Sequence, residues 1–282
     1  MLRFICSYFN FSNSKKVKKN YIKFRKNFPY DLTTIEVALP DQEFFIDDSI
    51  KITAQDNQIL WQKERCLNIA IEDLPSNTDS IAWVDTDVIF HNDRLLQDTE
   101  KSLSEYKVVQ LFDQCFEKPK VNPYHNNYGI GKTLVDNLDI KLPAIGFAWG
   151  FRKDILLDNK LYDSNPVGNS DVLQLLTWLG VWNHKTIMDL SPAYRKEFLL
   201  WAWNSYEKVQ GNVGYVNGTL EHIYHGKLYY RKYHDRNNIL LKHNFIPSQD
   251  LTIDNNLLYS LKYKTSMISE ILQYFESRKK HE

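Results

Sequence analysis

The run from Ser80 to Phe90, SIAWVDTDVIF, places the strongest constraint on how this chain can fold. Ile81–Val84 is apolar and rich in strand-forming residues, and the apolar character resumes at Val88. Between these segments lie Asp85 and Asp87. Burying two bare carboxylates is costly, so we expect them to be solvated at a strand end, paired with cations, or bound to a metal ion.

Strands and helices are predicted to alternate along the chain. A buried strand is predicted at Leu2–Phe9, and an amphipathic helix with a basic face at Lys15–Phe24. Further strands are predicted at Thr33–Leu39, Ile81–Val84, Tyr106–Phe112 and Pro143–Phe151, and helices at Leu60–Leu74 and Asp171–Trp182, the latter with Ser170 as N-cap. This order predicts an α/β fold with a mainly parallel sheet covered by helices on both faces, whose ligands bind at the carboxyl ends of the strands.

The composition excludes several classes of protein. With 282 residues, of which 43% are hydrophobic, the chain can form one large domain or a domain with an appendage. Basic and acidic residues number 35 each, so no overall charge favours nucleic acid or an anionic membrane surface. No stretch approaches the roughly 20 apolar residues of a membrane span.

Cysteine usage and the first residues lead to an expected location. The cysteines Cys6, Cys66 and Cys115 are widely separated and form no CxxC pair, which argues against a disulfide framework or a zinc knuckle. The apolar segment at the beginning of the sequence is too short for a signal peptide, and the residues after Phe11 are too polar. We therefore expect a soluble, cytoplasmic protein.

The spacing of Asp85 and Asp87 suits a hard divalent cation. In an extended backbone, residues i and i+2 point the same way, so both carboxylates can face one position beyond the strand. An ion held by one or two carboxylates completes its shell with water and substrate phosphates, which indicates a nucleoside diphosphate. The alternative is a turn at the strand end in which the aspartates hydrogen-bond neighbouring amides.

The order of several motifs resembles a known family. They are LWQKERCLNIAIEDLP, IAWVDTDVIFHND, VVQLFDQ, GFAWGFRKDIL with LYD, GNSD, and EHIYHG with RKYHDR. This order, over Leu2–Leu240, resembles the metal-dependent GT-A-type glycosyltransferases with a DxD motif, and within them the small bacterial and viral glycosyltransferases. The resemblance implies a GT-A fold with a mixed, mainly parallel sheet, a catalytic domain over residues 1–245, and a C-terminal helical extension over residues 246–282 packed on or trailing that domain.

The resemblance also implies an activity and a metal site. It implies transfer of a hexose from a nucleoside-diphosphate sugar, expected to be a UDP-sugar, to a hydroxyl of a glycan or other acceptor. Asp87 would bind Mn2+ or Mg2+ directly, and Asp85 would contact the ribose or the ion's water shell. His225 would be a third ligand, because Gly226 follows it as in the His-Gly pair of the glycogenin-like family.

The residue that contacts the phosphates of the sugar donor in the segment after His225 is not decided by the sequence. The chain lacks the Lys-Pro-Trp that follows the His-Gly pair in the glycogenin-like family. The cation that contacts the phosphates is therefore undecided among Lys227, Arg231 and Arg236. The alternative reading of the whole segment is an ordinary surface with solvated charges.

Other candidate donor contacts lie earlier in the chain. Lys63 and Arg65 precede the DxD strand, and either could face the pyrophosphate or be solvated. By resemblance, the end of the first strand, from Ser7 to Asn10, holds the base and ribose, with Tyr8 or Phe9 stacking on the base, although core packing explains these aromatics equally well. Trp149 would form a stacking platform for a sugar if exposed; the alternative is a buried core residue.

The reaction needs a proton acceptor if it inverts the anomeric centre. Asp171, in GNSD, is the candidate base, with Asp113 and Asp163 as weaker ones. An acidic residue at a helix N-terminus is also favoured by the helix dipole, so a structural role for Asp171 is an alternative. If configuration is retained, no such base is required.

Two other classes of function compete with a glycosyltransferase. A nucleotidyltransferase or nucleotide-sugar hydrolase could use the same fold and metal, but the first strand is not followed by a Gly-rich phosphate loop. A carbohydrate-binding protein could use the aromatic residues and a structural metal without catalysis.

Overall fold

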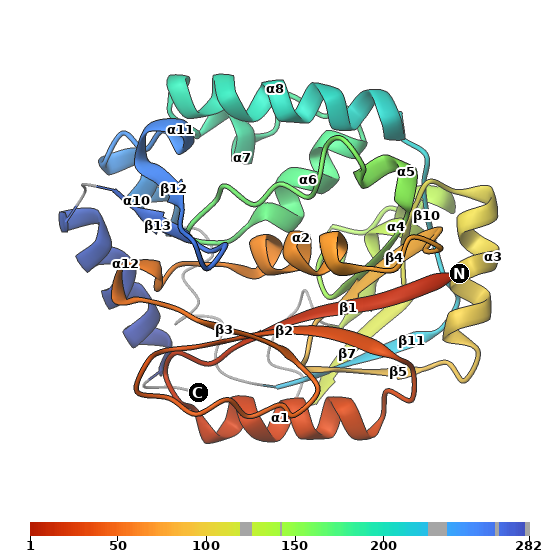
Figure 1. Ribbon diagram of the computed structural model, residues 1–282. Helices are drawn as coiled ribbons and strands as arrows, with labels where there is room; N and C mark the ends of the chain where they lie inside the picture. The colour runs from red at the N-terminus through yellow and green to blue at the C-terminus, as the bar shows by residue number, and fades with distance from the viewer. Residues whose placement is uncertain (119–125, 142, 225–235, 263–264, 280–282) are drawn as a thin grey trace.

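The computed structural model describes residues 1–118, 126–141, 143–224, 236–262 and 265–279. Its central sheet has seven strands, in the order β10 (Val213–Tyr215), β6 (Val108–Gln110), β9 (Ala148–Arg152), β4 (Ser80–Val84), β1 (Leu2–Phe9), β2 (Leu32–Ala38) and β3 (Ile50–Thr53). Neighbouring strands are parallel except β9, which is antiparallel to both β4 and β6. The prediction of an α/β fold with a mixed, mainly parallel sheet is confirmed (Figure 1).

A second sheet meets the central one at the predicted acidic segment. It has four strands, in the order β5 (Val88–His91), β11 (Thr219–Ile223), β7 (Gln114–Lys118) and β8 (Asn127–Tyr128). The chain leaves the central sheet at Val84, the last residue of β4, and enters the second sheet at Val88, the first residue of β5. The segment from Asp85 to Asp87 is therefore the turn that connects the two sheets.

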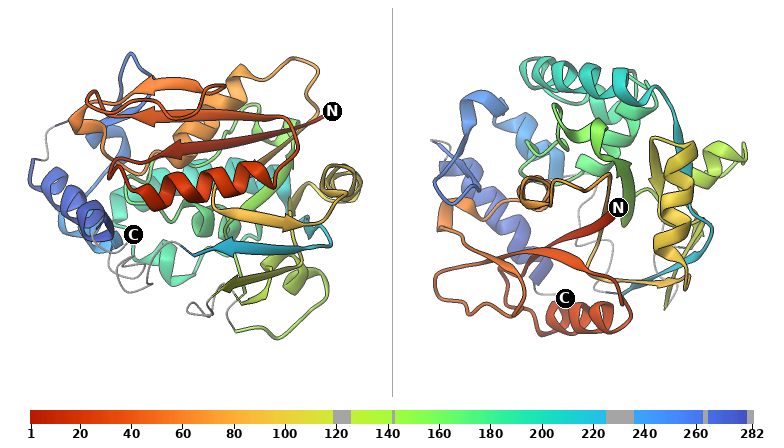
Figure 2. Two further views of the ribbon diagram at one scale, coloured as in Figure 1. Left: turned by 90° about the horizontal axis from the view of Figure 1, so that it is seen from below. Right: turned by 45° about the vertical axis from the view of Figure 1, so that its right-hand side comes forward.

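Side chains of β1 alternate between two core regions, which explains why helices cover both faces of the sheet. Ile5 packs in one region with residues of α2 (Lys63–Asp73), and Phe4 and Cys6 pack in the other with residues of α1 (Lys15–Lys26) and α3 (Leu95–Glu105). This is the period of two expected of a strand buried on both faces. Figure 2 shows α1 and α2 on opposite sides of β1.

A third core region joins helices to the C-terminal segment. It brings together α6 (Ser170–Trp178), α8 (Pro192–Val209), α10 (Arg236–Lys242), the two-stranded sheet of β12 (Leu251–Ile253) and β13 (Tyr259–Leu261) that follows α11 (Pro247–Asp250), and α12 (Thr265–Lys279). Met267 and Ile271 of α12 are fully buried against this region. The segment after residue 246 is therefore packed against the rest of the chain, and it contains a β-hairpin that we did not predict.

Short helices complete the described structure: η1 (Asp56–Gln58), α4 (Ile130–Val135), α5 (Lys153–Leu156) and α7 (Lys185–Met188). Within the described residues, no helix combines the length and the apolar character needed to cross a bilayer. Strand β10 lies at one edge of the central sheet. Gly214 is required in β10, because a Cβ atom there would approach the ring of Tyr106 to 2.3 Å.

Helix α1 offers a test of the core on one face of the sheet. Phe24 is fully buried and stacks on Phe28, whereas Ile22 on the same helix is 54% exposed. We expect Phe24→Ala to lower the free energy of unfolding by about 3–5 kcal/mol, since it leaves a cavity, and Ile22→Ala to lower it by less than about 1 kcal/mol. Urea denaturation measures both, and equal losses in the two variants would contradict this packing.

Candidate functional site

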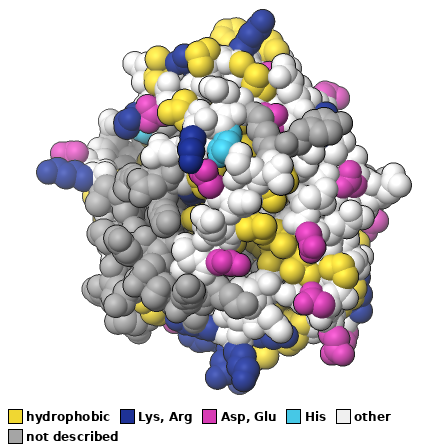
Figure 3. All heavy atoms as spheres, turned by 90° about the vertical axis from the view of Figure 1, so that its left-hand side faces the viewer, with side chains coloured by type: hydrophobic (Ala, Val, Ile, Leu, Met, Phe, Trp, Pro, Cys, Tyr) yellow, Lys and Arg dark blue, Asp and Glu magenta, His cyan; other side chains and the backbone are white. Residues whose placement is uncertain are grey.

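A cavity of about 980 Å³ lies at the carboxyl ends of β1 and β4. Its walls come from segments that are far apart in the sequence, including Tyr8, Lys63, Asp85, Asp171, His222 and Phe275. Figure 3 views the molecule from the side on which β1 ends, where acidic and hydrophobic side chains lie close together. The position agrees with the expectation that ligands of such a sheet bind at the carboxyl ends of its strands.

Backbone hydrogen bonds fix the acidic turn between the two sheets. The amide of Asp85 donates to the carbonyl of Phe147 at 2.8 Å, and the amide of Ile223 donates to the carbonyl of Asp87 at 2.7 Å. The side chains of Asp85 and Asp87 are 26% and 23% exposed, and both line the cavity. The turn therefore presents two partly exposed carboxylates to one space.

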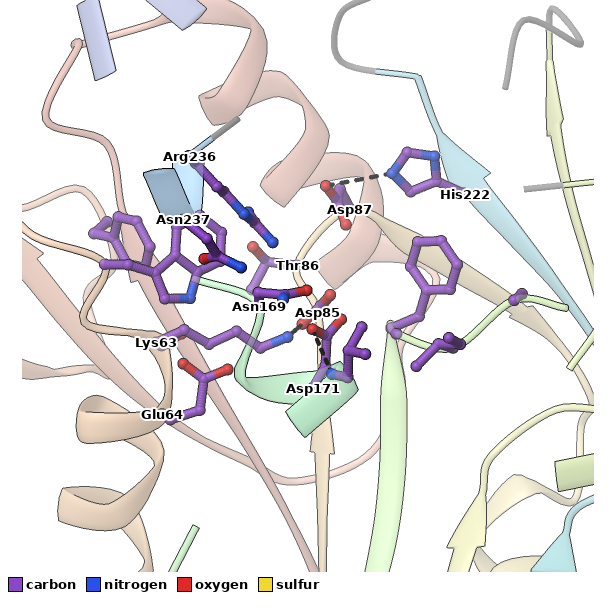
Figure 4. A pocket seen from close by; sticks show the side chains of 18 of the residues that line it. Lys63, Glu64, Asp85, Thr86, Asp87, Asn169, Asp171, His222, Arg236 and Asn237 are labelled. Carbon is purple, nitrogen blue, oxygen red and sulfur yellow. Dashed lines mark hydrogen bonds and ion pairs between the residues drawn. The ribbon is translucent and has the colours of Figure 1, made fainter. Parts of the chain in front are cut away.

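Lys63 forms an ion pair with Asp85. The ammonium group of Lys63, in the first turn of α2, contacts Oδ1 of Asp85, and its side chain is 12% exposed (Figure 4). Burial lowers the pKa of Lys63, but the carboxylates of Asp85, Glu64 and Asp171 outweigh burial and raise that pKa above its ordinary value. Lys63 therefore carries a positive charge beside the acidic turn.

His222 lies beside Asp87 and is held by a second carboxylate. Its Nε2 atom is 3.7 Å from Oδ2 of Asp87, and its Nδ1 atom is 2.7 Å from Oε1 of Glu117. His222 and Glu117 are neighbours across the paired strands β11 and β7, and each side chain is 2% exposed. A histidine that binds a metal is commonly oriented in this way by a carboxylate on its other nitrogen.

The side chains around Asp85, Asp87 and His222 are of the types that can contact a divalent ion whose remaining coordination positions are filled by water or substrate. In the described part of the chain, no three His, Cys, Asp or Glu side chains are grouped closely enough to hold a metal ion by themselves. The candidate third ligand His225 lies outside the described residues. The carboxylates of Asp85 and Asp87 could contact a Mn2+ or Mg2+ ion, with His222 3.7 Å from Asp87, if water and phosphate oxygens completed the shell of the ion.

Glu64 is a buried carboxylate in the wall of the cavity. It follows Lys63 in α2 and is 4% exposed. Burial raises its pKa from 4.5 to about 7, against the opposing effect of Lys63. A helix N-terminus favours an acidic side chain by about 0.3–1 kcal/mol, which is less than the roughly 3 kcal/mol that such a pKa change represents. The helix dipole therefore does not account for the placement of Glu64.

Asp171 lines the cavity at the N-terminus of α6. Its Oδ1 atom accepts a hydrogen bond from the amide of Val172 at 2.9 Å, and a Cβ atom on Gly146 would approach its Oδ2 atom to 3.1 Å. The weaker candidate bases lie outside the cavity wall: Asp163 pairs with Arg65 and accepts hydrogen bonds from Asn68 and Tyr259, and Asp113 follows β6.

Two residues of the cavity wall have left-handed backbone conformations. Phe147 has φ 78° and Asn169 has φ 86°. Such conformations cost on the order of 1–3 kcal/mol for residues with side chains, and they are frequent at functional sites. At Phe147 the conformation accompanies the hydrogen bond that its carbonyl accepts from the amide of Asp85, so the strain helps to place the acidic turn.

Aromatic residues form the wall at the end of β1. The ring of Tyr8 is buried against Tyr21 and Phe45, whereas Phe9 is partly exposed between Phe11 and Trp61. Asn10 uses its amide within the loop, because it donates to the carbonyl of Ser14 and accepts from the Ser14 amide, each at 2.9 Å. Phe9, rather than Tyr8, is therefore placed to contact a planar ligand.

Several other predicted contacts lie elsewhere. Arg65 donates to the carbonyl of Leu257 at 2.6 Å and lies over the ring of Tyr259, so it ties α2 to the C-terminal hairpin and does not line the cavity. Trp149 is 1% exposed in the core and donates to the carbonyl of Ile145, which leaves it no exposed face for stacking. This corrects the interpretation of Trp149 as a sugar platform.

The basic residues of the late segment are only partly described. Lys227 and Arg231 lie outside the described residues. Arg236, in the first turn of α10, lines the cavity and extends toward Thr86 (Figure 4). Of the three cations considered from the sequence, Arg236 is the one whose position at the cavity is described.

Sequence reasoning did not select Glu64, Trp61, Glu117 or Phe275, and it preferred His225 to His222. Glu64 stands between the two cations that were considered, Lys63 and Arg65, but an acidic residue in a first helical turn is an ordinary feature. Phe275 is far in sequence from every motif, and Glu117, which follows VVQLFDQ, reaches His222 through the pairing of β7 with β11. His222 could have been identified from the alternation of side chains along a strand, which places every second residue on the same face.

Comparisons with known proteins give low-identity similarities to solved structures. No protein-family model matches the sequence. A search of curated proteins also gives no match. Residues 1–349 of TarS from S. aureus, in complex with UDP-GlcNAc, give a TM-score of 0.43 at 10% identity over 79% of this chain and 58% of that one. The chain thus spans less than two thirds of the TarS fragment.

Two other structures resemble the chain over more of its length. Glucosyl-3-phosphoglycerate synthase from Mycobacterium tuberculosis, with Mn2+, UDP-glucose and phosphoglyceric acid, gives a TM-score of 0.38 at 10% identity over 93% of this chain and 86% of that one. A putative nucleotide-diphospho-sugar transferase from Desulfovibrio desulfuricans gives 0.37 at 10% identity over 99% and 96%. All three scores are below 0.5, and the fold described above rests on the strand pairing of this chain itself.

The pKa of Glu64 predicts a pH-dependent gain in stability for Glu64→Gln. Because the folded state binds this proton more tightly than the unfolded state, the charge of Glu64 destabilises the fold progressively from pH 4.5 to about pH 7 and fully above it. We expect Glu64→Gln to raise the free energy of unfolding by up to about 3 kcal/mol at about pH 8 and by much less at about pH 5.

Urea denaturation at both pH values measures this difference. The matched control is Glu72→Gln, at an exposed position on the same helix where Glu72 pairs with Lys160. The control should change stability by less than about 1 kcal/mol at either pH. An equal effect of Glu64→Gln at both pH values would contradict the assignment of a buried, ionising Glu64.

Proposed function

We propose that this chain is a metal-dependent glycosyltransferase. It would move a hexose from a nucleoside-diphosphate sugar, expected to be a UDP-sugar, to a hydroxyl group of a glycan or other acceptor. The observation that carries the proposal is the placement of Asp85 and Asp87, whose carboxylates open together onto one cavity at the junction of two sheets. Two adjacent carboxylates beside a lysine in a ligand-sized cavity suit a cation and a diphosphate together.

The residues of the acidic turn would hold the ion and the leaving group. Asp87 and Asp85 would bind Mn2+ or Mg2+, with His222 as a third ligand beside Asp87 and His225 as the alternative. When bound, the ion would stabilise the charge that develops on the departing diphosphate. Lys63 would move from Asp85 toward the phosphates, since its ammonium group keeps its positive charge beside the acidic turn.

The other walls would place the nucleotide and the acceptor. Phe9 and its neighbour Phe11 offer partly exposed rings for the base at the end of β1. Asp171 would accept the proton of the acceptor hydroxyl if the reaction inverts configuration, and the amide of Val172 holds one of its two oxygens in place. The sugar would lie between these groups, near Glu64 and Asn169.

Metal-dependent binding of UDP tests the proposal. Calorimetry should detect binding of UDP in the presence of Mn2+ and none in the presence of EDTA, because the diphosphate then faces carboxylates without the ion. Asp85→Ala and Asp87→Ala should remove the binding and the metal-dependent turnover while the protein remains folded. Asp93→Ala, at an exposed position after β5, is the matched control and should bind as the wild type does.

Two outcomes would count against the proposal. Retained metal-dependent turnover in both variants of the acidic turn would exclude their role. A protein that binds free sugar and no nucleotide would instead favour a carbohydrate-binding module.

Substitution of Asp171 tests the candidate base. We expect Asp171→Asn to lower kcat for transfer by about 10²–10⁴-fold with little change in the KM for the donor, because proton transfer is lost while binding remains. Asp113→Asn should leave both constants near their wild-type values, since Asp113 does not line the cavity. A wild-type kcat in Asp171→Asn would exclude Asp171 as the base, and NMR analysis of the product anomer would show whether a base is required.

A further inference from the structure

Glu64 is a buried carboxylate that faces the cavity and lies outside the proposed metal and proton-transfer steps. The residue is 4% exposed, and it lines the cavity next to Lys63 (Figure 4). In the part of the chain that the structure describes, no other residue donates a hydrogen bond to its carboxylate or forms an ion pair with it. A buried carboxylate in this situation requires hydrogen-bond donors from a ligand or from water.

The chemistry of a carboxylate limits what that ligand group can be. A carboxylate accepts hydrogen bonds and repels phosphate oxygens, so Glu64 does not suit the diphosphate. The ammonium group beside it is already directed to Asp85. Hydroxyl groups of a sugar are hydrogen-bond donors that a buried carboxylate binds well.

The position of Glu64 favours the transferred sugar over the ribose. Figure 4 shows the carboxylate of Glu64 next to the side chain of Lys63, with Asp171 and Asp85 beyond the ammonium group of Lys63. Lys63 lies at the proposed diphosphate position and Asp171 at the proposed acceptor position. A sugar in transfer is bonded to the diphosphate on one side and attacked by the acceptor on the other, so it must occupy the space between those two residues.

We propose that Glu64 recognises the transferred hexose of the donor by accepting hydrogen bonds from its hydroxyl groups. This inference rests on the proposed function and assigns a specificity-determining residue to the same site. A donor that lacks the matching hydroxyl leaves Glu64 buried without a partner, and such a site discriminates strongly against that donor.

The test compares UDP with sugar nucleotides in the presence of Mn2+. Calorimetry gives Kd values of UDP, UDP-glucose, UDP-galactose and UDP-N-acetylglucosamine for the wild type, Glu64→Gln and Glu64→Ala. For the sugar nucleotide that the wild type binds most tightly, we expect the Kd to rise by about tenfold or more in both variants, while the Kd of UDP changes by less than about threefold. Glu72→Gln, on the same helix and outside the cavity, should change neither.

Each other outcome overturns the inference in a recognisable way. Equal weakening of UDP and sugar nucleotide would assign Glu64 to the nucleotide or to the shape of the cavity. Unchanged Kd values in both variants, weakening in the Glu72→Gln control, or wild-type binding of UDP without any of the three sugar nucleotides would overturn the role in sugar recognition and leave the proposed function standing. Failure of the wild type to bind UDP with Mn2+ would overturn both.

Discussion

The ion pair between Lys63 and Asp85 is the interaction on which the candidate site depends. It joins the first turn of α2 to the end of β4, in a region where Glu64, Asp87 and Asp171 add further carboxylates. Like charges in a partly buried region repel one another unless cations offset them. Lys63 offsets part of this charge. In the proposed function, a divalent ion would offset the remainder and would bind the diphosphate beside it.

The fold places these groups by joining two sheets at one turn. Because β4 belongs to the central sheet and β5 to the second one, the backbone must turn at Thr86, and the carboxylates on either side of it reach the cavity. The strained conformation of Phe147 supports this turn through its carbonyl. The second sheet also carries the buried pair of His222 and Glu117 to Asp87, so both sheets contribute to the same corner.

The sequence predicted the elements with strong apolar periodicity and the residues that interrupt them. The strand Leu2–Phe9 matches β1 residue for residue, and the strand that precedes Asp85 matches β4. Helix α8 was not predicted, because its buried residues are interleaved with exposed ones such as Leu200 and Trp203, which obscures the apolar face. The short strands of the second sheet and the C-terminal hairpin are held by tertiary pairing, which local sequence does not reveal.

The site shows the same division between local and long-range information. Asp85 and Asp87 could be selected because charge within an apolar strand is a local anomaly, whereas Glu64 and Glu117 resemble ordinary acidic residues until their burial is known. The most direct test of the metal site is anomalous X-ray diffraction from crystals that contain Mn2+ and UDP. We predict a manganese peak between the carboxylates of Asp85 and Asp87 and the diphosphate. Bound UDP with no manganese at these carboxylates would contradict the central claim.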